Sequence, residues 1–162
     1  MVKRFRKVAV GGTFDRLHKG HIRLIEKALE MGSSVILGLT TDEMLKSYPK
    51  KHDVTIFSER LRDLLNYLTR LGVISRVRVV PLNDLYGPTI VDREIEALIV
   101  SAETSSRGDE INEIRRKKGF QPMRIIIVDT VMADDGLPIS TSRIRKSEID
   151  REGHLIVQEV KK

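Results

Sequence analysis

Two short segments near opposite ends of the chain carry residues whose types suit the binding of phosphate groups. Residues 11–21 read GGTFDRLHKGH and hold Thr13, His18 and His21. Residues 139–145 read ISTSRIR and supply hydroxyl and guanidinium groups. Imidazole N–H groups, hydroxyls and guanidinium groups all donate hydrogen bonds to phosphate oxygens. The two segments therefore favour a polyphosphate ligand whose chemistry depends on positioning and charge stabilisation.

The first segment lies where a strand gives way to a helix. An apolar run ends at Gly11 and Gly12, and residues 22–29 then show apolar positions at helical spacing. The two glycines allow a positive φ and a close backbone approach to a ligand. The helix start offers N–H groups and the positive end of the helix dipole to an anion. Since His18 and His21 are three residues apart, we expect them to project side by side there.

Other interpretations of these polar residues stay open at this point. Two histidines three residues apart could ligate a metal, but no third histidine stands near them, so no metal ligand is assigned. Asp15 either caps the turn or contacts a ligand, and Ser140 could equally cap a helix. His52 and His154 lie outside both segments and are expected to be solvated.

The rest of the chain predicts the elements that hold the two segments. Five short apolar runs lack strict alternation, which is typical of strands covered on both faces; they span 8–10, 35–39, 77–80, 98–100 and 125–128. Because helical patterns separate these runs, we predict an α/β fold with a doubly wound, five-stranded parallel sheet. In such sheets ligands bind beyond the carboxyl ends of the strands, where 11–13, 40–42, Ser101 and Asp129 are placed.

Two of the separating helices are clear. Residues 58–71 have Ser58 as the expected N-cap, Gly72 as the stop and a stripe of leucines assigned to the core: Leu61, Leu64, Leu65, Leu68 and Leu71. Residues 104–118 form a polar helix with a basic end before Gly119, which suits the helix dipole.

The composition limits the class of protein. The 162 residues fit a single domain over 1–162, and the absence of cysteine excludes disulfides and thiolate metal sites. No apolar run approaches the roughly 18 residues of a membrane span, and we predict a cytoplasmic protein without a membrane partner. A net charge of +6 suits polyanionic partners, but 4% aromatic residues provide few platforms for stacking nucleic-acid bases.

Together, GGTFDRLHKGH and ISTSRIR resemble the two signatures of the nucleotidylyltransferase superfamily, G-x-F-D-x-x-H-x-G-H and I-S-[ST]-[ST]-x-I-R. The resemblance implies a Rossmann-like nucleotidylyltransferase fold. It also implies that a phosphate or similar nucleophile attacks the α-phosphorus of a nucleoside triphosphate and that pyrophosphate leaves.

The same resemblance assigns roles to individual residues. His21 is expected at the α-phosphate, His18 beside it on the triphosphate, and Thr13 on the reacting phosphates. The remaining nucleotide-binding residues that it implies are Gly11, Phe14, Arg107, Ser140, Thr141, Ser142 and Arg145.

The longer pattern is most similar to phosphopantetheine adenylyltransferases of the archaeal and eukaryotic type. Its further matches are GLTTDEMLKS at 38–47, LYGPT at 85–89 and VSAET at 100–104. That family makes dephospho-coenzyme A and pyrophosphate from ATP and phosphopantetheine with Mg²⁺. The resemblance implies that Lys46 binds the attacking phosphate as a catalytic residue, and that Asp84 and Tyr86 border the substrates.

Related enzymes fit the sequence less well. Cytidylyltransferases carry Arg-Thr-Glu-Gly before the second signature, where this chain has DDGLP at 134–138. Bacterial phosphopantetheine adenylyltransferases often lack the histidine found here as His18. FAD synthetases share the G-T-F-D of the first segment and remain an alternative, as does a non-catalytic nucleotide-binding module. We expect small-molecule substrates, no nucleic-acid partner and a monomer, with oligomers left open.

Overall fold

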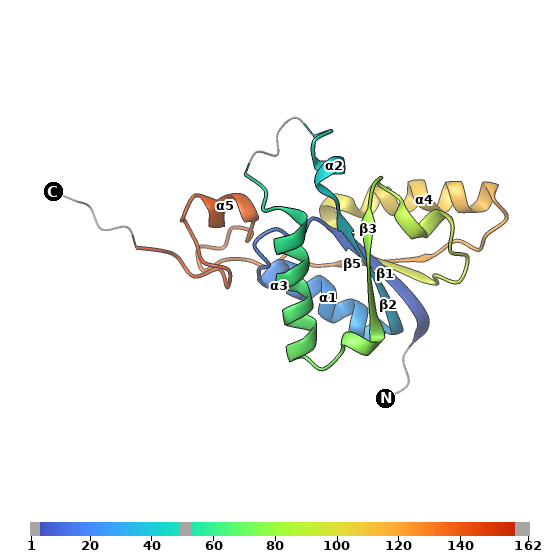
Figure 1. The fold of residues 1–162 in the computed structure, drawn as a ribbon, viewed down its shortest axis with the longest axis horizontal. Helices are drawn as coiled ribbons and strands as arrows, with labels where there is room; N and C mark the ends of the chain where they lie inside the picture. The colour runs from blue at the N-terminus through green and yellow to red at the C-terminus, as the bar shows by residue number, and fades with distance from the viewer. Residues whose placement is uncertain (1–3, 49–52, 158–162) are drawn as a thin grey trace.

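The computed structural model describes residues 4–48 and 53–157. These residues form one five-stranded parallel sheet with helices packed against it (Figure 1). The strands are β1 (Phe5–Gly12), β2 (Gly32–Thr40), β3 (Val77–Leu82), β4 (Ala97–Ser101) and β5 (Arg124–Val128). Their order is β3-β2-β1-β4-β5, and every neighbouring pair is parallel. Each strand contains one of the predicted apolar runs, so the doubly wound α/β fold is confirmed.

Helices cover both faces of this sheet. The longer ones are α1 (Lys19–Met31), α3 (Phe57–Arg70) and α4 (Ser105–Lys117); the short ones are α2 (Asp42–Leu45) and α5 (Thr141–Arg145), with 3₁₀ turns η1 (Ile74–Arg76), η2 (Gly87–Ile90) and η3 (Ala102–Thr104). Side chains alternate along β1, so that Val8 packs with Ile25 of α1 and Leu64 of α3 in one core. Ala9 instead joins the second core, which contains Ile111 of α4.

The structure corrects two details of α3. The helix begins at Phe57 with Ile56 as N-cap, so the prediction of Ser58 as the cap is wrong. It ends as predicted before Gly72, whose φ of 70° suits glycine. Among the leucines, Leu64 and Leu68 are buried, Leu61 and Leu65 are half-buried, and Leu71 is 48% exposed, which contradicts its assignment to the core.

An arginine takes the place on the buried face of α3 that the stripe of leucines was expected to fill. Arg60 stands four residues before Leu64 and is only 1% exposed. A second buried arginine lies at the end of α4. The predicted basic end is confirmed, with Arg115, Arg116 and Lys117 in the last turn, but Arg115 is buried whereas Arg116 and Lys117 are exposed. Arg115 instead donates hydrogen bonds to the backbone carbonyls of Thr89, Asp92, Arg93, Ile95 and Gln121.

After β5 the chain folds into a small unit that carries the second segment. An antiparallel bridge joins Met132 to Pro138, and another joins Ile149 to Leu155. The unit has its own small core of Ala133, Ile139 and Ile149, on which α5 sits (Figure 1). In the part of the chain that the structure describes, no helix combines the length and apolar character needed to cross a membrane.

Candidate active site

A cleft of about 630 Å³ lies beyond the carboxyl ends of the strands and is lined by both sequence segments. Its lining also includes Ser101 at the end of β4 and Asp129 after β5, as the parallel topology predicts. Every predicted site residue except Lys46 belongs to the lining: Gly11, Thr13, Phe14, His18, His21, Asp84, Tyr86, Arg107, Ser140, Thr141, Ser142 and Arg145.

The two histidines form the cap at the start of α1, and each side chain accepts a hydrogen bond from the backbone of the other residue. His18 is the N-cap, and its Nδ1 accepts hydrogen bonds from the N–H groups of Gly20 at 3.0 Å and His21 at 3.4 Å. In return, His21 Nδ1 accepts from the backbone N–H of His18 at 3.2 Å. The arrangement is a capping box built from imidazoles in place of the usual hydroxyl and carboxylate. The rings stack with centroids 3.6 Å apart, so the predicted side-by-side projection is confirmed.

This capping box fixes the tautomer of both rings. An Nδ1 atom that accepts a hydrogen bond carries no proton, so each neutral ring must carry its proton on Nε2. Burial lowers the pKa of His18 to about 4, with a further contribution from the charge of Arg151. Burial lowers the pKa of His21 to about 3, helped by the neighbouring His18. At neutral pH the site therefore holds two neutral imidazoles that serve as Nε2–H donors.

The N–H groups of the first turn of α1 are not free to bind an anion, contrary to the expectation from the sequence. Those of Gly20 and His21 bond to His18 Nδ1, and that of Ile22 bonds to the His18 carbonyl at 3.0 Å. The N–H of Lys19 bonds to the Arg151 carbonyl at 2.9 Å. The helix start thus contributes its dipole and the two imidazoles, while its amides hold the backbone in place.

The tight turn of the first segment also differs from the expectation. Gly11 and Gly12 end β1 with extended backbone, and the left-handed conformation falls on Phe14 at φ 50° and Arg16 at φ 49°. A positive φ costs a bulky residue free energy and persists only where the surroundings enforce it. Asp15, between them, is 3% exposed, pairs with Arg16, and accepts the N–H of Thr55 at 3.1 Å. Asp15 therefore holds the turn.

The second segment is tied directly to the first. Ser140 is the N-cap of α5 and accepts from the N–H of Arg143 at 3.3 Å. The hydroxyl of Thr141 donates to the backbone carbonyl of Asp15 at 3.2 Å. Arg143 forms an ion pair with Asp135 and another with Glu148 at 3.0 Å, which brackets the segment on both sides. These contacts leave Ser142 and Arg145 in the lining of the cleft.

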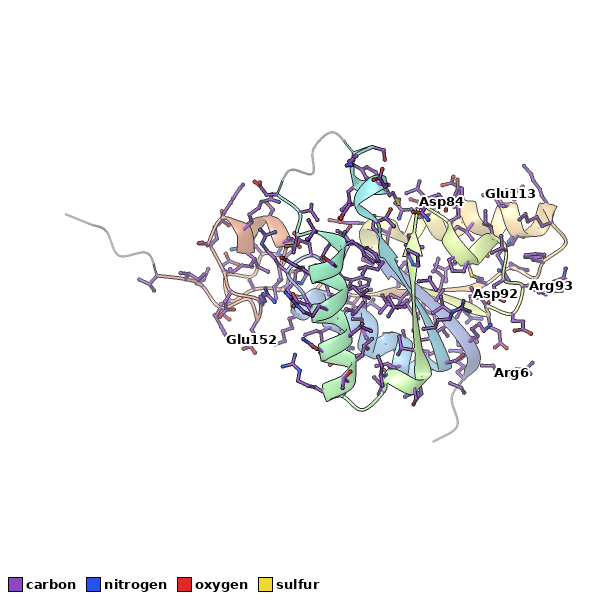
Figure 2. The ribbon with its side chains drawn as sticks, in the orientation of Figure 1. Arg6, Asp84, Asp92, Arg93, Glu113 and Glu152 are labelled. Carbon is purple, nitrogen blue, oxygen red and sulfur yellow. The ribbon has the colours of Figure 1, made fainter. Side chains whose placement is uncertain are left out.

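The opposite wall of the cleft comes from η2 and α4. Asp84, at the end of β3 in Figure 2, accepts the N–H groups of Tyr86 at 2.9 Å and Gly87 at 2.7 Å, so its Oδ1 shapes this turn. The Tyr86 hydroxyl donates to Glu110 of α4. Arg107, also from α4, lines the cleft between these groups and the strand ends.

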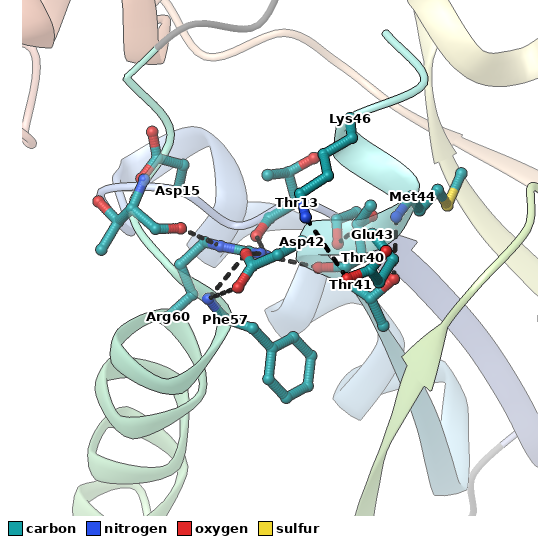
Figure 3. A network of polar contacts seen from close by, with 12 residues as sticks. Thr13, Asp15, Thr40, Thr41, Asp42, Glu43, Met44, Lys46, Phe57 and Arg60 are labelled. Carbon is teal, nitrogen blue, oxygen red and sulfur yellow. Dashed lines mark hydrogen bonds and ion pairs between the residues drawn. The ribbon is translucent and has the colours of Figure 1, made fainter.

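Lys46 does not reach the cleft lining in this structure. It is the C-cap of α2, its side chain is 73% exposed, and its Nζ lies 3.5 Å from Glu43 one turn earlier (Figure 3). His154 is exposed, as expected, and pairs with Asp134 at 3.2 Å. His52 lies outside the described residues.

The structure adds Arg60 to the surroundings of the site, a residue that the sequence pattern did not single out. Figure 3 shows it reaching from α3 to the ends of β1 and β2. The available signal was a charged residue on the leucine face of an amphipathic helix. Among the residues described, no group of three or more histidine, cysteine, aspartate or glutamate side chains is placed to hold a metal ion.

Comparison with known proteins agrees with this geometry. A family model described as Cytidylyltransferase-like matches residues 9–147. A phosphopantetheine adenylyltransferase of Methanosarcina mazei is 51% identical over 152 residues, which cover 92% of this chain and 96% of that protein. The phosphopantetheine adenylyltransferase of Methanopyrus kandleri is 49% identical over 147 residues, covering 91% of this chain and 92% of the relative.

Solved structures share the fold. A protein of unknown function from Archaeoglobus fulgidus superposes with a TM-score of 0.67 at 34% identity, covering 76% of this chain and 89% of its own. A tyrosyl-tRNA synthetase from the same organism gives a TM-score of 0.63 at 13% identity, covering 88% of this chain and 60% of its own. At that identity the second match shows the fold alone.

Proposed function

This chain belongs to the cytidylyltransferase-like family, and we propose that within it the protein transfers the adenylyl group of ATP to 4′-phosphopantetheine, giving dephospho-coenzyme A and pyrophosphate. Curated relatives with that activity in their name match it at about half of all positions over nearly its whole length. The observation that carries the proposal is that His21 of the first segment and Ser142 of the second line the same cleft.

The reaction exchanges one phosphoanhydride bond for another. A phosphate oxygen of phosphopantetheine forms a bond to the α-phosphorus of ATP, and the bond from that phosphorus to the oxygen bridging to the β-phosphate breaks. The electron pair leaves with pyrophosphate. Because the attacking phosphate is already ionised at neutral pH, no side chain has to remove a proton. The protein is left with positioning and stabilisation of the developing charge.

The site residues suit this task. The Nε2–H groups of His21 and His18 donate to the α-phosphate and its neighbour without themselves changing charge, because both imidazoles are neutral. Thr13, Ser140 and Ser142 add hydroxyl groups. Arg145 and Arg107 supply positive charge along the β- and γ-phosphates. Lys46 would turn from Glu43 toward the acceptor phosphate. Breaking the ion pair costs little free energy, because an exposed ion pair is worth about 1 kcal/mol or less.

Mg²⁺ enters this proposal as part of the nucleotide substrate. The two segments bring imidazoles whose Nδ1 atoms are already bonded, hydroxyls and Arg145 into the cleft. Carboxylates such as Asp84 and Asp129 also line it, but among the described residues no three histidine or carboxylate side chains stand together as a metal site. Such a set fits the phosphates better than a metal cage. Mg²⁺ is commonly bound through substrate phosphates and water, where it neutralises part of the charge on the leaving pyrophosphate.

An acceptor series tests the proposal. Protein, Mg²⁺ and ATP are mixed in turn with phosphopantetheine, FMN or no acceptor, and both pyrophosphate and the organic product are measured. We expect dephospho-coenzyme A and pyrophosphate in equal amounts with phosphopantetheine alone. Product with FMN instead would make the protein an FAD synthetase. Tight ATP binding without any product would make it a nucleotide-binding module. Replacing ATP with CTP tests the choice of nucleotide, and we expect no product with CTP.

The proposal includes small-molecule substrates, no nucleic-acid partner, a monomer and a cytoplasmic location. A nucleic-acid binder would show affinity that falls steeply with salt because counterions are released. Sedimentation velocity tests the monomer, and cell fractionation tests the location.

A further inference from the structure

Arg60 is only 1% exposed, and it bonds to several elements at once beside the cleft. Its Nε donates to the Thr55 carbonyl at 2.6 Å. Its Nη1 donates to the carbonyls of Thr13 at 2.9 Å and Thr40 at 2.8 Å, and its Nη2 pairs with Asp42 Oδ1 at 3.0 Å. One guanidinium group therefore joins the turn after β1, the junction between β2 and α2, and the residues just before α3 (Figure 3).

Each partner of Arg60 supports a part of the site. Thr13 lines the cleft, and its carbonyl leads into the left-handed Phe14. Thr40 ends β2, and its hydroxyl bonds to the Gly12 carbonyl at 3.1 Å. Asp42 begins α2, whose C-cap is Lys46, the residue expected on the acceptor phosphate. Arg60 thus connects the nucleotide side of the site to the acceptor side.

Fold stability alone gives a weak reason for this arginine. Its position on α3 continues the buried face of Leu64 and Leu68, where a large apolar side chain would fill the same space. Burying a guanidinium group costs free energy, and replacing a whole buried ion pair by apolar residues is often neutral or stabilising. Three of the four acceptors are backbone carbonyls, whose positions a rigid planar fork can fix.

We propose that Arg60 is a positioning residue for adenylyl transfer, holding the Thr13 peptide and the start of α2 in the relative placement that aligns the acceptor phosphate with the α-phosphorus. This inference rests on the proposed function. Arg60 is nearly inaccessible to solvent and acts through Thr13 and α2 without touching the substrates. A misplacement of about 1 Å between reacting groups can lower a rate about 10²-fold.

The test compares Arg60→Lys with Arg76→Lys. Arg76 makes the same kind of contact at the opposite end of β2, donating to the carbonyls of Leu29, Gly32 and Ser33. Lysine keeps the charge but lacks the planar fork. We expect Arg60→Lys to lower kcat about 10²-fold, with the affinity for ATP changed by less than about threefold. Arg76→Lys is expected to lower the midpoint of thermal unfolding with kcat near that of the natural protein.

Unchanged kcat in Arg60→Lys, assayed well below its unfolding temperature, would overturn the proposal, as would equal losses of kcat in the two variants. If Arg60→Lys does not fold, Asp42→Asn takes its place, because it removes the charged partner of Arg60 and keeps an acceptor oxygen. For that variant we expect a several-fold loss of kcat, and an unchanged kcat counts against the positioning role.

Hydrogen exchange without substrates separates this inference from the proposed function. Faster exchange is expected in Arg60→Lys at the amides of residues 12–17 and 53–56, but not in β4. Unchanged exchange there overturns the positioning role whatever the acceptor is. If the natural protein makes no dephospho-coenzyme A but the exchange rises as expected, the proposed function fails and the structural connection through Arg60 stands.

Discussion

The hydroxyl of Thr141 donates a hydrogen bond to the backbone carbonyl of Asp15 over 3.2 Å, although the two residues are 126 positions apart in the chain. The contact joins the start of α5 to the turn that carries Thr13 and leads to His18. Asp15 is in turn fixed by Arg16 and by the N–H of Thr55. The two sequence segments, 11–21 and 139–145, are therefore joined to each other without any bound nucleotide.

Thr141→Val tests this junction, because valine has the same shape but cannot donate the hydrogen bond. We expect a loss of about 1 kcal/mol in the free energy of unfolding, typical of one hydrogen bond, and a kcat/KM for ATP lowered several-fold. Urea unfolding and steady-state kinetics measure the two effects. Thr69→Val, at an exposed position of α3, is the control for the loss of a threonine hydroxyl. Equal kinetics in both variants would show that the junction has no functional effect.

His21 takes part in the cap of α1, and its proposed contact with the α-phosphate is a second role that substitution can separate from the first. His21→Ala removes an Nε2–H donor and also the acceptor for the His18 N–H. We expect kcat to fall about 10²–10³-fold and stability to fall by about 1 kcal/mol. His21→Gln can still accept from the N-cap, as glutamine does in an ordinary capping box, so its stability should recover while kcat stays low. Recovery of kcat in His21→Gln would mean that the imidazole matters for the helix cap alone.

The depressed pKa values of the two histidines predict the pH dependence of stability. The folded protein keeps His18 neutral down to a pKa of about 4 and His21 down to about 3, whereas both take up protons near pH 6.5 when unfolded. Because the unfolded state then binds more protons, stability is lost as the pH falls from 6.5 toward 4. The loss amounts to at most about 1.4 kcal/mol per pH unit for each histidine.

Urea unfolding at pH 7.5, 5.5 and 4.5 measures this effect. The control is the double variant His18→Asn/His21→Gln, which preserves a capping box without titrating groups. Subtracting its profile isolates the pair from His154, whose pKa is raised by its contact with Asp134. An identical pH profile in the two proteins would contradict the buried, neutral state of the pair.

Lys46 offers a test of the acceptor side. We expect Lys46→Met to raise the KM for phosphopantetheine at least tenfold with little change in the affinity for ATP. Its partner in the structure is Glu43, so Glu43→Gln should leave that KM unchanged or lower it slightly, since it frees the ammonium group. Equal KM values in Lys46→Met and the natural protein would remove Lys46 from the site.

The sequence was sufficient to predict the five-stranded parallel sheet and the side-by-side projection of His18 and His21. Those features follow from short-range patterns, namely apolar runs and helical spacing, whereas the common site of the two segments was implied by their resemblance to the two signatures of one superfamily. The local chemistry of the turn was beyond such patterns. That Phe14 and not Gly12 takes the left-handed conformation depends on contacts from Arg60 and Asp15, which are long-range.

Buried arginines account for the other differences. Periodicity assigns a buried face to leucines because a charge rarely stands there, so it does not single out Arg60 or Arg115 as buried. Their burial requires several backbone carbonyls to converge on one point, and only the folded chain shows that convergence. The amides of α1 differ from the expectation for a similar reason. A helix start alone predicts free N–H groups for phosphate, and only the folded chain shows that His18 Nδ1 accepts two of them.

The fate of the α-phosphate tests the central claim most directly. The protein is incubated with Mg²⁺, phosphopantetheine and ATP labelled either on the α- or on the γ-phosphorus, and the label is followed into the acceptor. We predict that the α-label appears in dephospho-coenzyme A with one pyrophosphate released for each label transferred, and that the γ-label appears in pyrophosphate alone. Transfer of the γ-label to phosphopantetheine, or release of the α-label as free AMP, would contradict the account.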